Sequence, residues 1–204
     1  MNEIEFDVKV FANYNKCNFI TLNDFNDNEN FDSCSYLSLI CINIRSLKRH
    51  FTELQTFLHS CKHTFSFVIV CETWLCSDFD NMFNLDGYLF HTLCRTENYG
   101  GIRLYYKNHL NVEVLNSQTL IHDSCEILAS KITIKNLSPI NLFCIYRPPL
   151  CSLPQFTQYI ETLIDDKFSN EKCLIVGKCE FFLIWIFAII LIFFHQYLNI
   201  PINY

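Results

Sequence analysis

The chain has 204 residues, of which half are hydrophobic and 16% are aromatic, so it can bury one sizeable core. Its net charge of −6 excludes a basic footprint spread over the whole chain, as a strong nucleic-acid binder would have, but not a local basic groove. The 12 cysteines form no CxxC pair, which excludes the common zinc-ribbon and thioredoxin patterns. Because acidic residues rather than a basic and apolar stretch follow Met1, we predict no signal peptide and reduced, intracellular thiols.

The first 36 residues differ in composition from the rest of the chain. They contain seven acidic residues and two lysines, which gives this segment −5 of the net charge. Asn and Asp are frequent, and no helical or strand period persists. We therefore predict a disordered leader over residues 1–36, an ordered domain over residues 37–179 and a hydrophobic tail over residues 180–204.

The ordered part begins with a predicted strand, helix and strand. Short apolar runs over residues 36–43 and 66–72 each end in a polar residue, as buried strands do. Between them Ser46 is a candidate helix cap. Apolar residues then recur at helical spacing on one face: Leu47, Phe51, Leu54 and Leu58. This order predicts a βαβ unit with a right-handed crossover.

From residue 100 onward the pattern favours strands, separated by Asn, Asp, Ser and Pro. The predicted strands cover residues 101–107, 112–115, 126–134 and 140–146. Phe156, Ile160, Leu163 and Ile164 then mark an amphipathic helix, and residues 173–177 a last buried strand. Together these elements predict a mixed α/β protein with sheets packed face to face and helices outside.

The tail begins with fourteen unbroken apolar residues, 181–194. As a helix they would span roughly 21 Å, which is short of the ~30 Å hydrocarbon core of a membrane. Continuing to residue 198 gives a helix long enough to cross, although no Lys or Arg cluster flanks it to fix an orientation. We predict a continuous helix over about 181–198, and leave a membrane segment and an accidental apolar tail as equal alternatives.

Polar side chains stand at the ends of three predicted strands, where α/β proteins usually build their sites. Glu72 ends one apolar strand and can hold a hard cation such as Mg²⁺. Asn43 offers a neutral oxygen and nitrogen for a phosphate or a metal-bound water. Tyr146 and Arg147 can donate to phosphate oxygens, and Arg can do so with two parallel bonds. Taken singly, each is more often a solvated strand end than a site.

The order of five motifs is more specific than any one of them. CINIRSL, VIVCETWL, GGIRLYYK from Gly100, LFCIYRPP and LIVG follow one another over residues 37–177. This order resembles the endonuclease/exonuclease/phosphatase superfamily, and it is most similar to the endonuclease domain of non-LTR retrotransposons of the jockey and CR1 type. ETWL together with YRPP carries most of that likeness.

The resemblance implies a four-layer α/β sandwich of the DNase I-like kind with a site at one rim. It implies that Glu72 binds the catalytic Mg²⁺ with support from Asn43, that Tyr146 contacts the scissile phosphate, and that Arg147 lies nearby. The implied reaction is hydrolytic nicking of DNA, with metal and donors stabilising the charge that develops on phosphate. In an intact element, the nick primes a reverse transcriptase encoded downstream.

The sequence departs from the family after the last strand. Where the family has Gly-Asp-Phe-Asn, this chain reads Gly177-Lys178-Cys179-Glu180, and the family's later Asp and Ser-Asp-His segments do not follow. Lys178 brings a positive charge to the place of an Asp. That charge opposes Mg²⁺ binding if the side chain points inward, but the side chain can also swing to solvent.

We therefore expect a truncated, degenerate and inactive retrotransposon endonuclease, in the nucleus or cytoplasm by family. A non-catalytic protein anchored in the membrane by residues 181–198 is the alternative from another class. A phosphatase of the same superfamily is the third, and it is disfavoured by ETWL and YRPP.

Overall fold

The computed structural model describes twelve stretches of the chain: residues 8–13, 16–20, 26, 37–76, 81–94, 100–115, 120–122, 125–135, 138–148, 151–168, 172–179 and 189–193. The helices and strands in these stretches are, in chain order, β1 (Val8–Asn13), β2 (Lys16–Ile20), β3 (Ser38–Asn43), α2 (Leu47–Ser60), β4 (Phe67–Cys71), β5 (Tyr88–Leu93), β6 (Ile102–Lys107), β7 (Asn111–Val114), β8 (Leu120–His122), β9 (Cys125–Thr133), β10 (Ile140–Arg147), α3 (Leu153–Phe168), β11 (Lys172–Cys179) and β12 (Ile189–Phe193).

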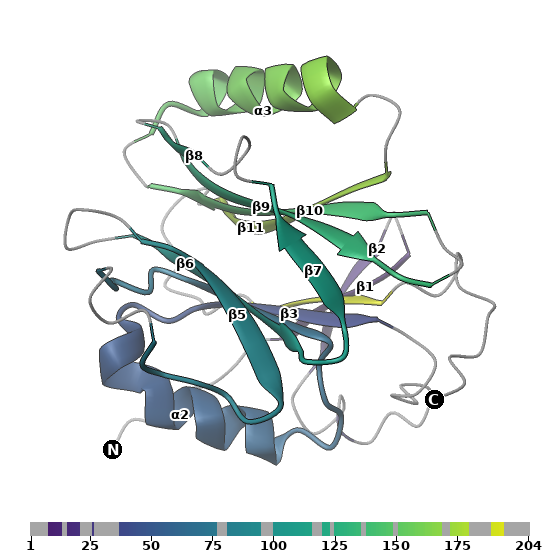
Figure 1. Cartoon of the computed structure of the whole chain (residues 1–204). Coiled ribbons are helices and arrows are strands. Elements are labelled where there is room, and N and C mark those ends of the chain that lie inside the picture. Colours follow the sequence, from purple (N-terminus) through teal and green to yellow (C-terminus); the bar gives the residue numbers. More distant parts are fainter. Residues whose placement is uncertain are drawn as a thin grey trace.

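The strands form two sheets. One has the order β2-β1-β12-β3-β4-β6-β5, and the other has the order β11-β10-β9-β7, with β8 paired to β9. Adjacent strands β3 and β4 are parallel and are joined by α2, so the predicted βαβ unit is confirmed. Strands β10 and β11 are also parallel and are joined by α3. Parallel neighbours need such a crossover, which is why both helices lie outside the sheets (Figure 1).

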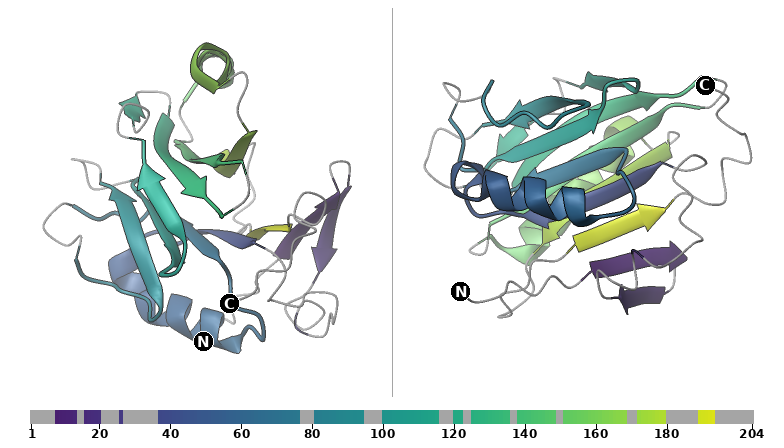
Figure 2. Two further views of the ribbon diagram at one scale, coloured as in Figure 1. Left: turned by 45° about the vertical axis from the view of Figure 1, so that its right-hand side comes forward. Right: turned by 90° about the horizontal axis from the view of Figure 1, so that it is seen from below.

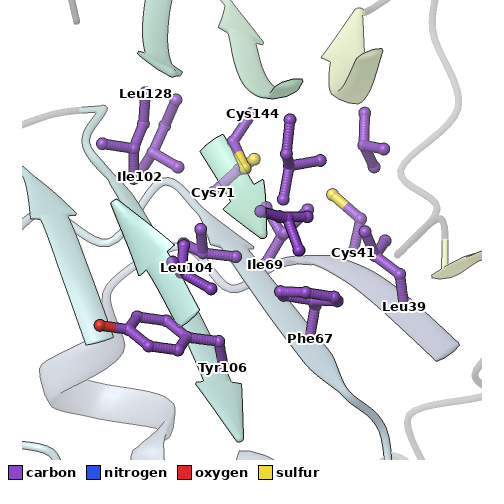
Figure 3. Packing of buried hydrophobic residues seen from close by; sticks show 14 of the residues in the cluster. Leu39, Cys41, Phe67, Ile69, Cys71, Ile102, Leu104, Tyr106, Leu128 and Cys144 are labelled. Carbon is purple, nitrogen blue, oxygen red and sulfur yellow. The ribbon is translucent and has the colours of Figure 1, made fainter. Parts of the chain in front are cut away.

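Three clusters of buried apolar side chains divide the molecule into four layers. Leu47, Leu54 and Phe57 of α2 pack on the outer face of the first sheet. Side chains from both sheets meet in a central cluster between them, shown in Figure 3. Phe156 and Ile160 of α3 pack on the outer face of the second sheet. The order of layers is thus helix, sheet, sheet, helix, and the predicted four-layer α/β sandwich is confirmed.

The burial of β3, β4, β9 and β10 explains why their strands were visible in the sequence. Strand β4 is buried at every position, and β3 and β10 are buried at all but their first. A strand covered on both faces reads as a continuous apolar run. The predicted amphipathic helices correspond to α2 and α3. Ser46 directly precedes α2 as expected, but its side chain makes no capping hydrogen bond, and its φ is 88°.

The two ends of the chain contribute strands to the first sheet. Strands β1 and β2 lie within residues 1–36, and β12 is a strand at residues 189–193 of the predicted tail helix, whereas the division of the chain into leader, domain and tail stays a prediction. Strand β12 pairs with β1 on one side and with β3 on the other. Strands β2, β1 and β12 therefore extend the first sheet beyond β3 (Figure 2). A short apolar run cannot be assigned to helix or strand by periodicity, and IILIF is rich in β-branched residues, which favour strands.

The rest of the predicted tail helix and the boundary at residue 36 lie outside the described residues. Within the described part of the chain, neither helix is long and apolar enough to span a membrane. The sequence also failed to indicate β5, whose side chains are mostly only half-buried and show no clear alternation.

Candidate active site

Two rows of polar residues face each other between the sheets at one rim. In the second sheet, Tyr146 of β10 is paired in register with Glu126 of β9 and with Lys178 of β11. Tyr146 belongs to the cluster between the sheets, and residues paired across strands point to the same face, so all three face the first sheet. Opposite them stand Asn43, which ends β3, and Glu72, which follows β4. The structure thus places Asn43, Glu72 and Tyr146 at the same rim.

The turn that carries Glu72 is held by backbone hydrogen bonds from the start of α2. The Ser46 N–H donates to the Glu72 carbonyl at 2.8 Å, and the Leu47 N–H donates to the Thr73 carbonyl at 2.9 Å. The φ angles of Ser46, Glu72 and Trp74 are 88°, 56° and 51°. This left-handed conformation costs non-glycine residues roughly 1–2 kcal/mol each. Such strain clusters at functional sites, where the surrounding structure fixes a side chain in one position.

The Glu72 carboxylate is engaged by two donors on the same oxygen. Asn43 Nδ2 donates to Glu72 Oε1 at 3.0 Å, and Lys178 Nζ lies 3.1 Å from that atom. The pair is shielded from water, because the side chains of Lys178 and Glu72 are only 17% and 11% exposed. Lys178 therefore points inward, which answers the alternative that the sequence left open.

A second buried carboxylate, Glu126, completes the other end of the rim. Its Oε2 accepts the backbone N–H of Gly101 at 2.6 Å. The neighbouring Gly100 has no room for a side chain, because a Cβ there would collide with the Glu126 carboxylate. The carbonyls of the two glycines in turn accept the N–H groups of Thr73 and Trp74. Glu126 thus anchors the glycine pair, and the glycine pair anchors the turn that carries Glu72.

The sequence did not single out Glu126, because this residue begins the predicted strand over residues 126–134, whereas the candidate residues were chosen where apolar strands end. Two signals were present: a carboxylate inside the apolar run of β9, and the Gly100-Gly101 pair before β6. A buried carboxylate needs donors, and a glycine pair lets backbone N–H groups approach closely. Their partnership joins residues 25 positions apart, and no local pattern reveals it.

Arg147 lies on a different face from the rest of the candidate residues. Side chains alternate along β10, so Arg147 shares the face of Phe143 and Ile145, which pack toward α3. Its guanidinium Nη1 donates to the Cys151 carbonyl at 2.6 Å, and the residue is 5% exposed. This contact braces the start of the connection to α3.

Cysteine thiols lie directly below the rim in the core between the sheets (Figure 3). A hydrogen bond with the Cys41 thiol and then burial raise the pKa of Cys71 well above its usual value, against a smaller opposing effect of the Lys178 backbone. Burial likewise raises the pKa of Cys144. These thiols are therefore neutral, and they fill the core as small apolar groups.

The arrangement does not fit the Mg²⁺ that the family resemblance implies. Mg²⁺ takes six ligands, mostly oxygens, at about 2.0–2.1 Å. Glu72 and Asn43 could supply oxygens, but an ammonium already lies 3.1 Å from Glu72 Oε1. In the stretches that the structure describes, no three His, Cys, Asp or Glu side chains gather closely enough to hold a metal ion.

No protein-family model matches the sequence, and no curated protein matches it. Solved structures do. The endonuclease domain of TRAS1, a telomere-specific non-LTR retrotransposon, superposes with a TM-score of 0.52 at 12% identity, over 70% of this chain and 59% of that domain. Truncated TDP2 from Caenorhabditis elegans gives 0.49 at 13% identity, over 69% of this chain and 59% of that one. The catalytic domain of Xenopus laevis APE2 gives 0.47 at 15% identity, over 69% and 57%.

The chain thus spans less than two thirds of the length of each of these structures. At these identities the likeness concerns the fold, and it is the TRAS1 domain on which the comparison rests. The four layers and the two facing sheets agree with that comparison. The chain therefore has a DNase I-like α/β sandwich fold, and its predicted likeness to a retrotransposon endonuclease domain is confirmed at the level of the fold.

Proposed function

We propose that this chain is a retrotransposon-derived, endonuclease-like domain that no longer nicks DNA. The fold shared with the TRAS1 domain and the ordered motifs from CINIRSL to LIVG support the origin. In this proposal DNA is the ancestral substrate, and phosphodiester hydrolysis with Mg²⁺ is the ancestral reaction. Asn43, Glu72 and Tyr146 are the surviving members of the ancestral site, whereas Arg147 has a structural role.

The contact between Lys178 and Glu72 carries the proposal. Hydrolysis of a phosphodiester needs positive charge placed where negative charge develops on phosphate. Here the inward positive charge is directed at the Glu72 carboxylate 3.1 Å away. The two charges neutralise each other, so the pair offers little to a phosphate. The Asp of the family motif, which could act as a general acid or base, is replaced by Lys178, and the Asn that helps hold the phosphate is replaced by Glu180.

Charge elsewhere also disfavours tight binding to DNA. Affinity for the phosphate backbone comes mainly from Lys and Arg that displace counterions. The chain has 15 Lys and Arg against 21 Asp and Glu. We therefore expect weak, strongly salt-dependent DNA binding.

The alternatives gain no support of their own. A phosphatase would depend on the same Glu72 and Asn43 and would meet the same objection. A membrane anchor would depend on a helix over residues 181–198, of which the structure describes the strand Ile189–Phe193.

A plasmid-relaxation assay with the purified full chain tests the proposal. We expect that supercoiled DNA is nicked no faster with Mg²⁺ than with EDTA, and no faster than by the Glu72→Ala variant. General acid–base catalysis alone typically supplies ~10²–10⁴-fold, so its loss is easily measured. Mg²⁺-dependent nicking that disappears in Glu72→Ala would show that the site is active and that the proposal is wrong.

A further inference from the structure

The Lys178 side chain is fixed by the sheet rather than placed at a free surface. Lys178 is paired in parallel register with Tyr146, and its backbone lies in hydrogen-bonding reach of the Cys71 thiol. The preceding Gly177 lies so close to β10 that a Cβ would collide with the Ile145 backbone. Close packing of β11 on β10 therefore holds the Lys178 side chain over the Glu72 turn.

The ammonium and a divalent cation would compete for the same carboxylate oxygen. Glu72 Oε1 lies 3.1 Å from Lys178 Nζ and 3.0 Å from Asn43 Nδ2. A hard cation bound to that oxygen would stand next to the ammonium, in a place where little water can screen the repulsion. The amide of Asn43 points its nitrogen, which is a donor and not a cation ligand, at Glu72.

Asn43 also keeps an unused oxygen at the rim. Its Oδ1 is buried and has no hydrogen-bond partner among the residues that the structure describes. A buried oxygen without a donor is costly, and native structures usually satisfy it. This oxygen lies beside the Glu72 carboxylate, so it is placed to serve as a second oxygen ligand to a cation.

We propose that Lys178 is the resident cation of this site and neutralises Glu72 in place of a divalent metal. The inference rests on the proposed function, since it explains why the endonuclease-like rim no longer needs or accepts Mg²⁺. It has two consequences. The folded chain gains no stability from divalent cations, and a carboxylate at position 178 recreates a cation site with Glu72 and the Asn43 oxygen.

The test measures cation binding, separately from nicking. Mn²⁺ and Mg²⁺ are titrated by calorimetry into the full-length wild-type chain, Lys178→Asp, Lys178→Met and the double variant Lys178→Asp/Glu72→Ala. Circular dichroism verifies folding, and the melting temperature is compared in EDTA and in millimolar Mg²⁺. Lys178→Met is the matched control, because it removes the ammonium and adds no ligand.

We expect no saturable binding and no shift in melting temperature for the wild type. Lys178→Asp should bind Mn²⁺ with one site, roughly 10-fold to 100-fold more tightly than Lys178→Met, and the double variant should lose that site. Saturable one-site binding of either cation by the wild type would overturn the inference. A folded Lys178→Asp chain without binding would overturn it too. Neither result depends on nicking, so failure of the proposed function is recognised separately.

Discussion

The ion pair between Lys178 and Glu72 is shielded from water, so we expect its loss to lower the stability of the fold. Exposed pairs contribute about 0–1 kcal/mol to stability, because water screens the charges. Here the side chains are 17% and 11% exposed, and Asn43 adds a second hydrogen bond to the same oxygen. Removing one partner of such a pair leaves a shielded charge and typically costs roughly 3–5 kcal/mol. The pair is thus a structural link between the two sheets as well as a feature of the site.

The thiols below the rim allow a test of how the core is packed. Cys71 and Cys144 are fully buried, and burial and neighbouring thiols keep them neutral by raising the pKa of each. Cys76 is exposed. We expect iodoacetamide to modify Cys76 in the native chain at mildly alkaline pH. Cys71 and Cys144 should react at least roughly 100-fold more slowly, because their reaction requires opening of the core.

Peptide mass spectrometry after timed alkylation measures these rates, and the chain in denaturant is the control in which all three thiols react. Comparable labelling of Cys71 and Cys76 in the folded protein would contradict the described packing.

At the scale of elements, the approach of β6 to the Glu72 turn depends on Gly101. Gly101 and Gly87 have similar left-handed φ angles, 86° and 78°. A Cβ on Gly87 would meet only Lys107 Nζ at 4.0 Å, whereas a Cβ on Gly101 would lie 2.5 Å from Thr73 Oγ1. We therefore expect Gly87→Ala to cost about 1–2 kcal/mol through backbone strain alone. Gly101→Ala should cost about 2–4 kcal/mol, because overpacking adds to that strain.

Urea denaturation of the two variants and the wild type gives both free energies of unfolding. Gly87→Ala is the matched control for backbone strain, so the difference between the variants isolates the collision with Thr73. Equal destabilisation would show that the Gly101 backbone is free to move away from the turn.

Strands covered on both faces could be predicted from the sequence, and elements defined by distant partners could not. The apolar runs of β3, β4 and β10 record burial on two sides. Strand β5 has mostly half-buried side chains, so its sequence is not a continuous apolar run. Strand β12 was assigned to a helix because an apolar run has no period, and its pairing with β1 and β3 is a property of the assembled sheet.

The same distinction holds for the site. Asn43, Glu72 and Tyr146 could be chosen because each lies at or next to the end of a buried strand, where the chain leaves the core. Glu126 lies inside a strand, and its partner Gly101 is revealed only by the fold. The direction of Lys178 is likewise set by the register of β11 on β10, which local sequence does not specify.

At the scale of the whole molecule, stability should fall in alkaline solution. Burial raises the pKa of Tyr88 to about 12, and its hydroxyl donates to the Phe65 carbonyl at 2.6 Å. In the unfolded chain the Tyr88 pKa is about 10, so folding favours the protonated form. This contribution is complete below pH ~10 and is lost as the pH rises through 12. Burial shifts the pKa of Tyr105 in the same direction.

Urea denaturation at several pH values between 8 and 12 measures this loss. The Tyr88→Phe variant should be less stable than the wild type at neutral pH, because it lacks the hydrogen bond, but its stability should decline less steeply in alkali. Parallel pH profiles for the two chains would show that Tyr88 titrates normally and is not held in the fold.

The central claim is that Lys178, and not a metal ion, neutralises Glu72 in this endonuclease-like fold. A crystal structure of the full chain grown with Mn²⁺, with anomalous data collected at the manganese edge, measures this directly. We expect no anomalous peak at Glu72, and the Lys178 ammonium within hydrogen-bonding distance of the Glu72 carboxylate. A peak coordinated by Glu72 and Asn43, with Lys178 turned away to solvent, would contradict the claim.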